Sequence, residues 1–94
     1  PWGAPLTTPA RKISGALAAG CSVIVKASEE TPACGLLLGQ IAYECGFPDG
    51  VLSILIGDPV MISDKLLRSD VIRGVTFSLI PISFSETWFI AIFP

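Results

Sequence analysis

Residues 22–32 constrain the fold most, because a strand and a helix follow each other there with only a short turn between them. Residues 22–25, Ser-Val-Ile-Val, are mostly β-branched and apolar, which is typical of a short buried strand. Thr31 and Pro32 then form a helix start, since threonine suits the capping position and proline the first helical position. A buried strand that leads directly into a helix predicts an α/β fold.

The same alternation continues along the rest of the chain. Thr8-Pro9 and Asp58-Pro59 repeat the helix start, and Gly20 and Gly46 are typical helix stops. Strands that alternate with helices predict crossover connections and a parallel sheet, in the order α-β-α-β-α-β. The expected strands occupy residues 22–25, residues 51–56 and part of residues 71–77. They are apolar without clear alternation, as strands covered on both faces are.

Cysteines and apolar residues mark one face of the second expected helix. This face carries Cys34, Leu37, Leu38, Ile41 and Cys45 at helical spacing. The three cysteines, with Cys21, fit neither a CxxC pair nor a zinc pattern, and their number is odd. We therefore expect them to be small buried hydrophobic side chains in a reducing compartment.

Composition excludes several classes of function. Of the 94 residues, 51% are hydrophobic and 15% charged, which is too apolar for a disordered chain. A chain this short has little interior in which to bury so many apolar residues. One explanation is that other parts of a larger protein cover its faces. A net charge of −2 without a basic run argues against nucleic acid as a partner. The absence of histidine excludes a histidine-based triad or a histidine-ligated metal, and we expect no metal site.

Residues 79–94 depart from the pattern of the preceding chain. They hold three of the five phenylalanines and one of the two tryptophans, with no cap, turn signal or clear period. A membrane span needs about 20 apolar residues, and Pro81 and Glu86 interrupt this shorter stretch. We expect a sticky hydrophobic tail outside the fold, whose removal improves solubility. A membrane-associated peptide is the alternative that this stretch leaves open.

Lys26 and Glu29 lie where the first expected strand gives way to a helix. In open α/β sheets, ligands bind just beyond the carboxyl ends of the strands. An ammonium group donates hydrogen bonds and a carboxylate accepts them, so this pair can hold a polyhydroxylated ligand. The alternative is a solvated turn with two ordinary surface charges.

Four stretches together resemble the aldehyde dehydrogenase superfamily. They are Pro-Trp-Gly-Ala-Pro-Leu at residues 1–6, the run from Ala16 to Pro32, Gly-Phe-Pro-Asp-Gly-Val at residues 46–51, and Val-Thr-Phe at residues 75–77. The resemblance covers residues 1–78 and leaves residues 79–94 as an aberrant hydrophobic tail. It implies a partial Rossmann-like parallel sheet with crossover helices, an incomplete domain from an enzyme that oxidises aldehydes to acids with NAD or NADP.

The resemblance assigns Lys26 and Glu29 to the adenosine ribose hydroxyls of the cofactor, with Ala27 and Ser28 lining the same turn. A carboxylate at Glu29 repels a 2′-phosphate, which favours NAD over NADP. By the same resemblance, Trp2 lies beside the cofactor and Gly57 lets the backbone pass close to the adenine. A core aromatic and a simple turn glycine are the respective alternatives.

The sequence also departs from the family. Gly3 stands where the family usually has an asparagine that helps to bind the oxyanion. Leu79 follows Ser78, where the family has Gly-Ser and a helix N-terminus that binds the pyrophosphate. The nucleophilic cysteine and the general-base glutamate of the family are absent, and none of Cys21, Cys34 and Cys45 matches the nucleophile. We therefore expect this chain to contribute the adenosine end of a cofactor site and to be inactive alone.

The resemblance has further implications for partners and location. The parent enzyme takes NAD and an aldehyde, and its family is homo-oligomeric. We expect a cytoplasmic location, since no basic and apolar leader precedes the family-like residues. The rival hypothesis, from a different class, is a non-catalytic product of a truncated or frameshifted gene.

Overall fold

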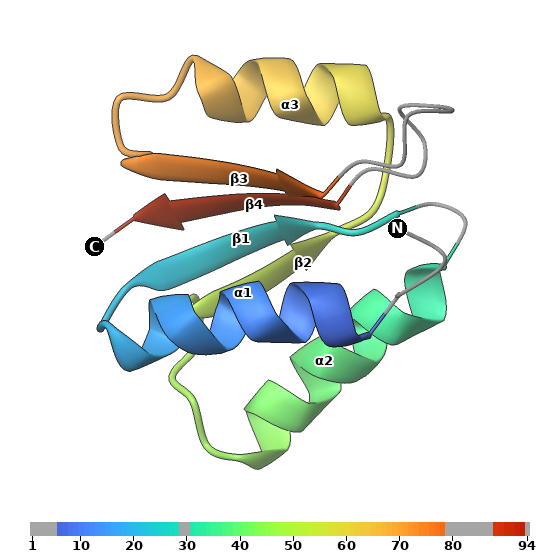
Figure 1. Cartoon of the computed structure of the whole chain (residues 1–94), viewed down its shortest axis with the longest axis vertical. Helices are drawn as coiled ribbons and strands as arrows, with labels where there is room; N and C mark the ends of the chain where they lie inside the picture. The colour runs from blue at the N-terminus through green and yellow to red at the C-terminus, as the bar shows by residue number, and fades with distance from the viewer. Residues whose placement is uncertain (1–5, 29–30, 79–87, 94) are drawn as a thin grey trace.

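The computed structural model describes residues 6–28, 31–78 and 88–93 of the chain. Helices and strands follow one another along this part of the molecule (Figure 1). In chain order they are α1 (Thr7–Ala18), β1 (Ser22–Lys26), α2 (Pro32–Glu44), β2 (Leu52–Leu55), α3 (Pro59–Leu67), β3 (Gly74–Ser78) and β4 (Trp88–Phe93).

Two of the expected helix starts lie where the sequence placed them. Thr31 directly precedes α2, and Asp58 directly precedes α3. The Asp58 carboxylate accepts a hydrogen bond from the Val60 N–H at 3.3 Å, which satisfies one of the free donors of the first turn. The expectation for Thr8 is wrong, because α1 begins after Leu6 and Thr8 lies inside the helix.

Glycine ends α1 as the sequence predicted. Gly20 has a φ of 85°, the left-handed region that favours glycine. Its N–H donates to the Leu17 carbonyl at 3.0 Å, and the Cys21 N–H donates to the Ala16 carbonyl at 3.0 Å. These two bonds satisfy carbonyls that the helix end would leave free, so the chain turns sharply from α1 into β1.

The strands form one sheet in the order β2-β1-β4-β3. β1 and β2 are parallel, with Val23 opposite Leu52 and Lys26 opposite Leu55. β4 is antiparallel to both of its neighbours, and Phe89 lies opposite Lys26. Consequently β1, β2 and β3 point in the same direction, while β4 points the opposite way (Figure 1).

The α/β class and the parallel pairing of β1 with β2 are confirmed, but the sheet is not parallel throughout. Residues 88–93, expected to lie in a loose tail, form a strand in the middle of the sheet. Their sequence, Trp-Phe-Ile-Ala-Ile-Phe, is rich in residues that favour strands. Removing them would open the facing edges of β1 and β3, so the expected gain in solubility no longer follows. Residues 79–87 lie outside the described part of the chain.

β1 is covered on both faces, because successive side chains of a strand point to opposite sides. One buried cluster joins α1 to one face of β1 and consists of Ile13, Ala16, Val23, Val25 and Ala27. Leu38 of α2 packs against this cluster. On the other face, Ile24 packs against Leu66 of α3. This arrangement explains why β1 is apolar without alternation.

The expected apolar face of α2 is only partly covered. Leu38 contacts the core, but Leu37 and Ile41 keep 48% and 44% of their surface exposed. α2 lies against β2, the strand at the edge of the sheet, which is too narrow to cover the whole helix face. Cys21 and Cys34 are half-buried free thiols, and Cys45 is an exposed one, so the expected burial of Cys45 is wrong.

A pair of glycine substitutions tests the end of α1. An added Cβ meets no atom within 4 Å at Gly20 or at Gly15, which lies inside the helix. Gly20→Ala should therefore lower the free energy of unfolding by about 1–2 kcal/mol through the positive φ alone. Gly15→Ala, the matched control, should raise it by about 0.5–1 kcal/mol. Urea denaturation followed by circular dichroism measures both, and a Gly20→Ala variant as stable as Gly15→Ala would contradict the assignment.

Candidate functional site

The carboxyl ends of β1 and β2 meet at one edge of the sheet (Figure 1). Lys26 ends β1 and lies opposite Leu55, which ends β2. The Ala27 N–H donates to the Leu55 carbonyl at 2.9 Å, so the two backbones stay together for one residue beyond β1. Open α/β sheets bind their ligands at edges of this kind.

Lys26, Ala27 and Ser28 are fully buried, each with 0% of its surface exposed. The alternative of a solvated turn with ordinary surface charges is therefore wrong for Lys26. A buried ammonium group needs polar partners, and Lys26 and Ser28 each interact with another group of the chain. Glu29 lies outside the described residues, so the prediction that Glu29 and Lys26 together hold a ligand stays a prediction.

Thr31 closes the turn that follows β1. Its N–H donates to the Ser28 carbonyl at 3.2 Å. Its hydroxyl does not cap α2, although the residue occupies the capping position. Thr31 Oγ1 is buried and has no hydrogen-bond partner among the described residues. Such an oxygen costs about 1–3 kcal/mol while it remains unpaired, so a hydroxyl group of a ligand in this turn would be stabilised by pairing with it.

Sequence reasoning missed this feature of Thr31. The Thr-Pro pair indicated a capping threonine, and the structure confirms the position of the residue but not the hydrogen bond. The sequence carried no signal for it, because the burial of Thr31 Oγ1 is a property of the folded chain. A buried hydroxyl group needs a hydrogen-bond partner, whether or not its residue caps a helix.

Gly57 lies two residues beyond the end of β2. A Cβ built on it would come within 3.2 Å of Ile62 Cδ1 on α3, which is closer than most side-chain contacts. The missing side chain therefore lets α3 pack close to the backbone at Gly57. The expectation that Gly57 lies near an adenine stays a prediction. Trp2 and Gly3 lie outside the described residues.

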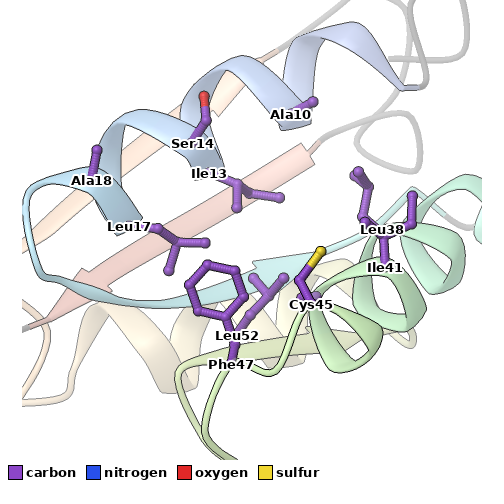
Figure 2. A pocket seen from close by; sticks show the side chains of 11 residues that line it. Ala10, Ile13, Ser14, Leu17, Ala18, Leu38, Ile41, Cys45, Phe47 and Leu52 are labelled. Carbon is purple, nitrogen blue, oxygen red and sulfur yellow. The ribbon is translucent and has the colours of Figure 1, made fainter.

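An apolar groove of about 440 Å³ lies between α1 and α2 (Figure 2). The side chains of Ile13 and Leu17 face those of Leu38 and Ile41 across it. Its lining is apolar except for the Ser14 hydroxyl and the Cys45 thiol. The groove reaches Leu52, the first residue of β2, and so lies away from the carboxyl edge of the sheet. It supplies no charged partner for a nucleotide.

Within residues 6–28, 31–78 and 88–93, no three His, Cys, Asp or Glu side chains gather as metal ligands would. Within the same ranges, every helix is too short or too polar to cross a membrane.

Comparison with known proteins identifies relatives for most of the chain. Over 78 residues it is 42% identical to the mitochondrial succinate-semialdehyde dehydrogenase of Arabidopsis thaliana. Over the same length it is 45% identical to the 4-(hydroxymethyl)benzenesulfonate dehydrogenase TsaD1 of Comamonas testosteroni and 35% identical to the glutarate-semialdehyde dehydrogenase of Pseudomonas aeruginosa. Each match covers 83% of this chain. No solved structure matches it.

The chain is short beside these relatives, since it spans 15% of the Arabidopsis protein and 16% of the other two. The sequence pattern of the aldehyde dehydrogenase family matches residues 1–78, which include α1, β1, α2, β2, α3 and β3. The match thus contains the carboxyl edge of the sheet with its buried lysine. On this evidence the chain belongs to the aldehyde dehydrogenase family of oxidoreductases.

Proposed function

We propose that residues 1–78 are part of the cofactor-binding domain of an enzyme that oxidises an aldehyde to a carboxylic acid. In this proposal they form a portion of a Rossmann-like domain and hold the adenosine ribose of NAD. The observation that carries it is the position of Lys26 at the carboxyl end of β1, next to the end of β2. Family membership supports the cofactor class and the reaction class.

Each residue of the turn after β1 has a separate role in this proposal. The Lys26 ammonium donates to the ribose hydroxyls and Glu29 accepts from them, while Ala27 and Ser28 shape the turn. Thr31 Oγ1, which is buried and has no partner among the described residues, fits an additional hydroxyl. Trp2 lies beside the cofactor and Gly57 near the adenine. NAD, when bound, takes up the hydride that the aldehyde carbon loses.

The proposal extends to the organisation and location of the protein. The family-like part of the protein is residues 1–78, residues 79–94 follow it in the sequence, and the parent enzyme is homo-oligomeric and cytoplasmic. The Arabidopsis relative is named as a mitochondrial protein, so the compartment differs within the family. The relatives' names include semialdehydes, which supports an aldehyde as the substrate class.

Replacing the buried ammonium tests the adenosine site. Lys26→Met keeps an unbranched side chain and removes the donor, so the affinity for NAD should fall about tenfold or more, the scale of a hydrogen bond to a charged group. Isothermal titration calorimetry measures the affinity, and circular dichroism reports whether each variant keeps its fold. Lys65→Met, on an exposed position of α3, is the matched control. A folded Lys26→Met variant with unchanged affinity would refute the proposed role.

A second substitution tests the preference for NAD over NADP. Glu29→Gln removes the carboxylate that repels a 2′-phosphate, so the preference should relax by about 1–3 kcal/mol. Glu30→Gln makes the same charge change at the next residue and should leave the preference unchanged. Parallel titrations of the two nucleotides measure the ratio of affinities. If the unmodified chain already binds NADP more tightly, the role of Glu29 is wrong.

In the second candidate, the chain has no catalytic function and is the product of a truncated or frameshifted gene. It is favoured by the abrupt end of the family match at Ser78, where β3 ends and Leu79 follows without a polar linker. In this case the chain has no dehydrogenase activity of its own, because the cysteine nucleophile of the family is missing.

The DNA sequence of the gene separates the two candidates. Beyond the codon for Ser78, we expect another forward reading frame to encode Gly-Ser within a few codons, because a helix N-terminus that binds pyrophosphate should follow β3. Farther on, the same frame should encode a glutamate and a cysteine at family spacing. If every forward frame lacks this continuation, the frameshift origin is refuted, residues 79–94 are a genuine part of the protein, and a non-catalytic product is the better candidate.

A further inference from the structure

β2 is an outer strand of the described sheet, and one of its two edges is open. In the order β2-β1-β4-β3 it is hydrogen-bonded to β1 alone. The Val51 and Leu55 carbonyls accept backbone hydrogen bonds of 2.8 and 2.9 Å from the β1 side. Backbone groups alternate in direction along a strand. The N–H and C=O groups of Leu52 and Ile54 therefore point away from β1, to a side where no described strand pairs with them.

The open edge of β2 lacks the features by which proteins protect outer strands. Such edges usually carry charged side chains, proline or a bulge, which hinder pairing with another chain. The sequence of β2 is Leu-Ser-Ile-Leu, without a charge or a proline. Its pairing with β1 runs residue by residue from Leu52 to Leu55, without a bulge. An unprotected edge of this kind favours a further strand as its neighbour.

Hollows lie beside β2 on both faces of the sheet. Towards α3, a hollow of about 550 Å³ is lined by Leu55 and Met61 among others, and Met61 keeps 64% of its surface exposed. Towards α2, a smaller hollow of about 100 Å³ is lined by Leu52 and Tyr43 among others, and Tyr43 is 72% exposed. Sheet edges that bind an added strand combine main-chain hydrogen bonds with hollows for its alternate side chains.

The free backbone groups of β2 match those of a second copy of the same strand. When two β2 strands lie antiparallel about a two-fold axis at Ser53, Leu52 of each copy lies opposite Ile54 of the other. Residues paired in this way exchange both of their N–H···O=C bonds. The two Leu52–Ile54 pairs therefore use all the outward backbone groups of both strands. Such an interface is self-complementary and closes after two copies.

We infer that this chain forms a two-fold dimer in which the open edges of two β2 strands pair and join the two sheets into one. A dimer interface needs about 800 Å² from each copy, more than a short strand edge offers. Tyr43 of α2 and Met61 of α3 lie exposed beside the edge and extend the apolar contact on the two faces. The inference is independent of the proposed cofactor site.

Ser53 lies on the axis of this dimer. Leu52 and Ile54 pack against the cluster on the α1 side of β1, so the intervening Ser53 side chain lies on the opposite face of the sheet. In the dimer the two Ser53 side chains are direct neighbours across the axis, the position at which like charges destabilise a strand pair. A substitution at Ser53 therefore acts on the dimer through its own copy in the other chain.

Charges at Ser53 test the dimer by sedimentation velocity. The unmodified 94-residue chain should sediment at twice the mass of one chain, whereas Ser53→Lys and Ser53→Glu should each sediment as monomers when alone. An equimolar mixture of the two variants should sediment as a dimer, because opposite charges then lie across the axis. Ser14→Lys and Ser14→Glu, the matched controls, change an exposed residue of α1, which contacts β1 and β4. Both controls should remain dimers.

Three results of this experiment would overturn the inference. They are a monomeric unmodified chain, an open series of larger oligomers, and a dimer that Ser53→Lys leaves intact. Circular dichroism of each variant reports whether the fold is kept. Recovery of the dimer in the mixture shows that the loss in the single variants comes from repulsion at the axis.

Hydrogen exchange of the unmodified chain gives a readout that needs no substitution. In the dimer, the amides of Leu52 and Ile54 bond to the other copy, while those of Ser53 and Leu55 bond to β1 in the monomer and the dimer alike. Dilution from dimer to monomer should therefore accelerate exchange at Leu52 and Ile54 by about tenfold or more and leave Ser53 and Leu55 unchanged. An equal response of all four amides, or no response, would refute pairing through this edge.

Discussion

β1 is hydrogen-bonded along both edges and covered on both faces, and the rest of the described structure depends on this strand. β2 and β4 bind its two edges, α1 and α2 pack on one face, and α3 packs on the other. Val23 and Val25 have no exposed surface as a result. Full burial of apolar strand residues supplies the main stabilising contribution in a chain this small, and β1 is the strand that the other elements enclose.

The same enclosure determines the chemistry at the end of β1. Burial continues beyond the strand to Ser28, so the Lys26 ammonium is removed from bulk water and its electrostatic interactions are stronger than they would be at the surface. The Ala27 N–H bond to the Leu55 carbonyl holds the backbone directly after β1 against β2, and such pre-organisation lowers the entropic cost of positioning a ligand. The candidate site is therefore a direct product of the central place of β1.

Local signals in the sequence predicted local structure well. Asp58 and Gly20 act through their immediate neighbours, so their roles in starting and ending helices are visible in a few residues. The prediction that Thr8 caps α1 was wrong, because proline is tolerated at more than one position of the first turn. The Thr-Pro pair therefore does not determine the first residue of the helix. The candidate site at the end of β1 was proposed from the strand-to-helix transition, which is also local, and its ligand stays a prediction.

Long-range pairing was not predictable in this way. Residues 88–93 carry no turn signal that connects them to β1. Their place in the sheet depends on the open edges of β1 and β3, which face each other only in the folded chain. The burial of Lys26 was missed for the same reason, because a lysine at the end of a strand is buried only when neighbouring strands enclose it. The exposed part of α2 reflects the narrow edge strand beneath it, which the spacing of apolar residues along the helix does not reveal.

The place of β4 in the sheet has a consequence during synthesis of the chain. β1 is completed early, but its second neighbour is made only after α2, β2, α3 and β3. Until then one edge of β1, whose Val23 and Val25 are fully buried in the folded protein, stays open, and pairing over so long a sequence separation is slow. The nascent chain is thus most prone to aggregation while residues 27–87 are being made, which places the demand for chaperones at that stage of translation.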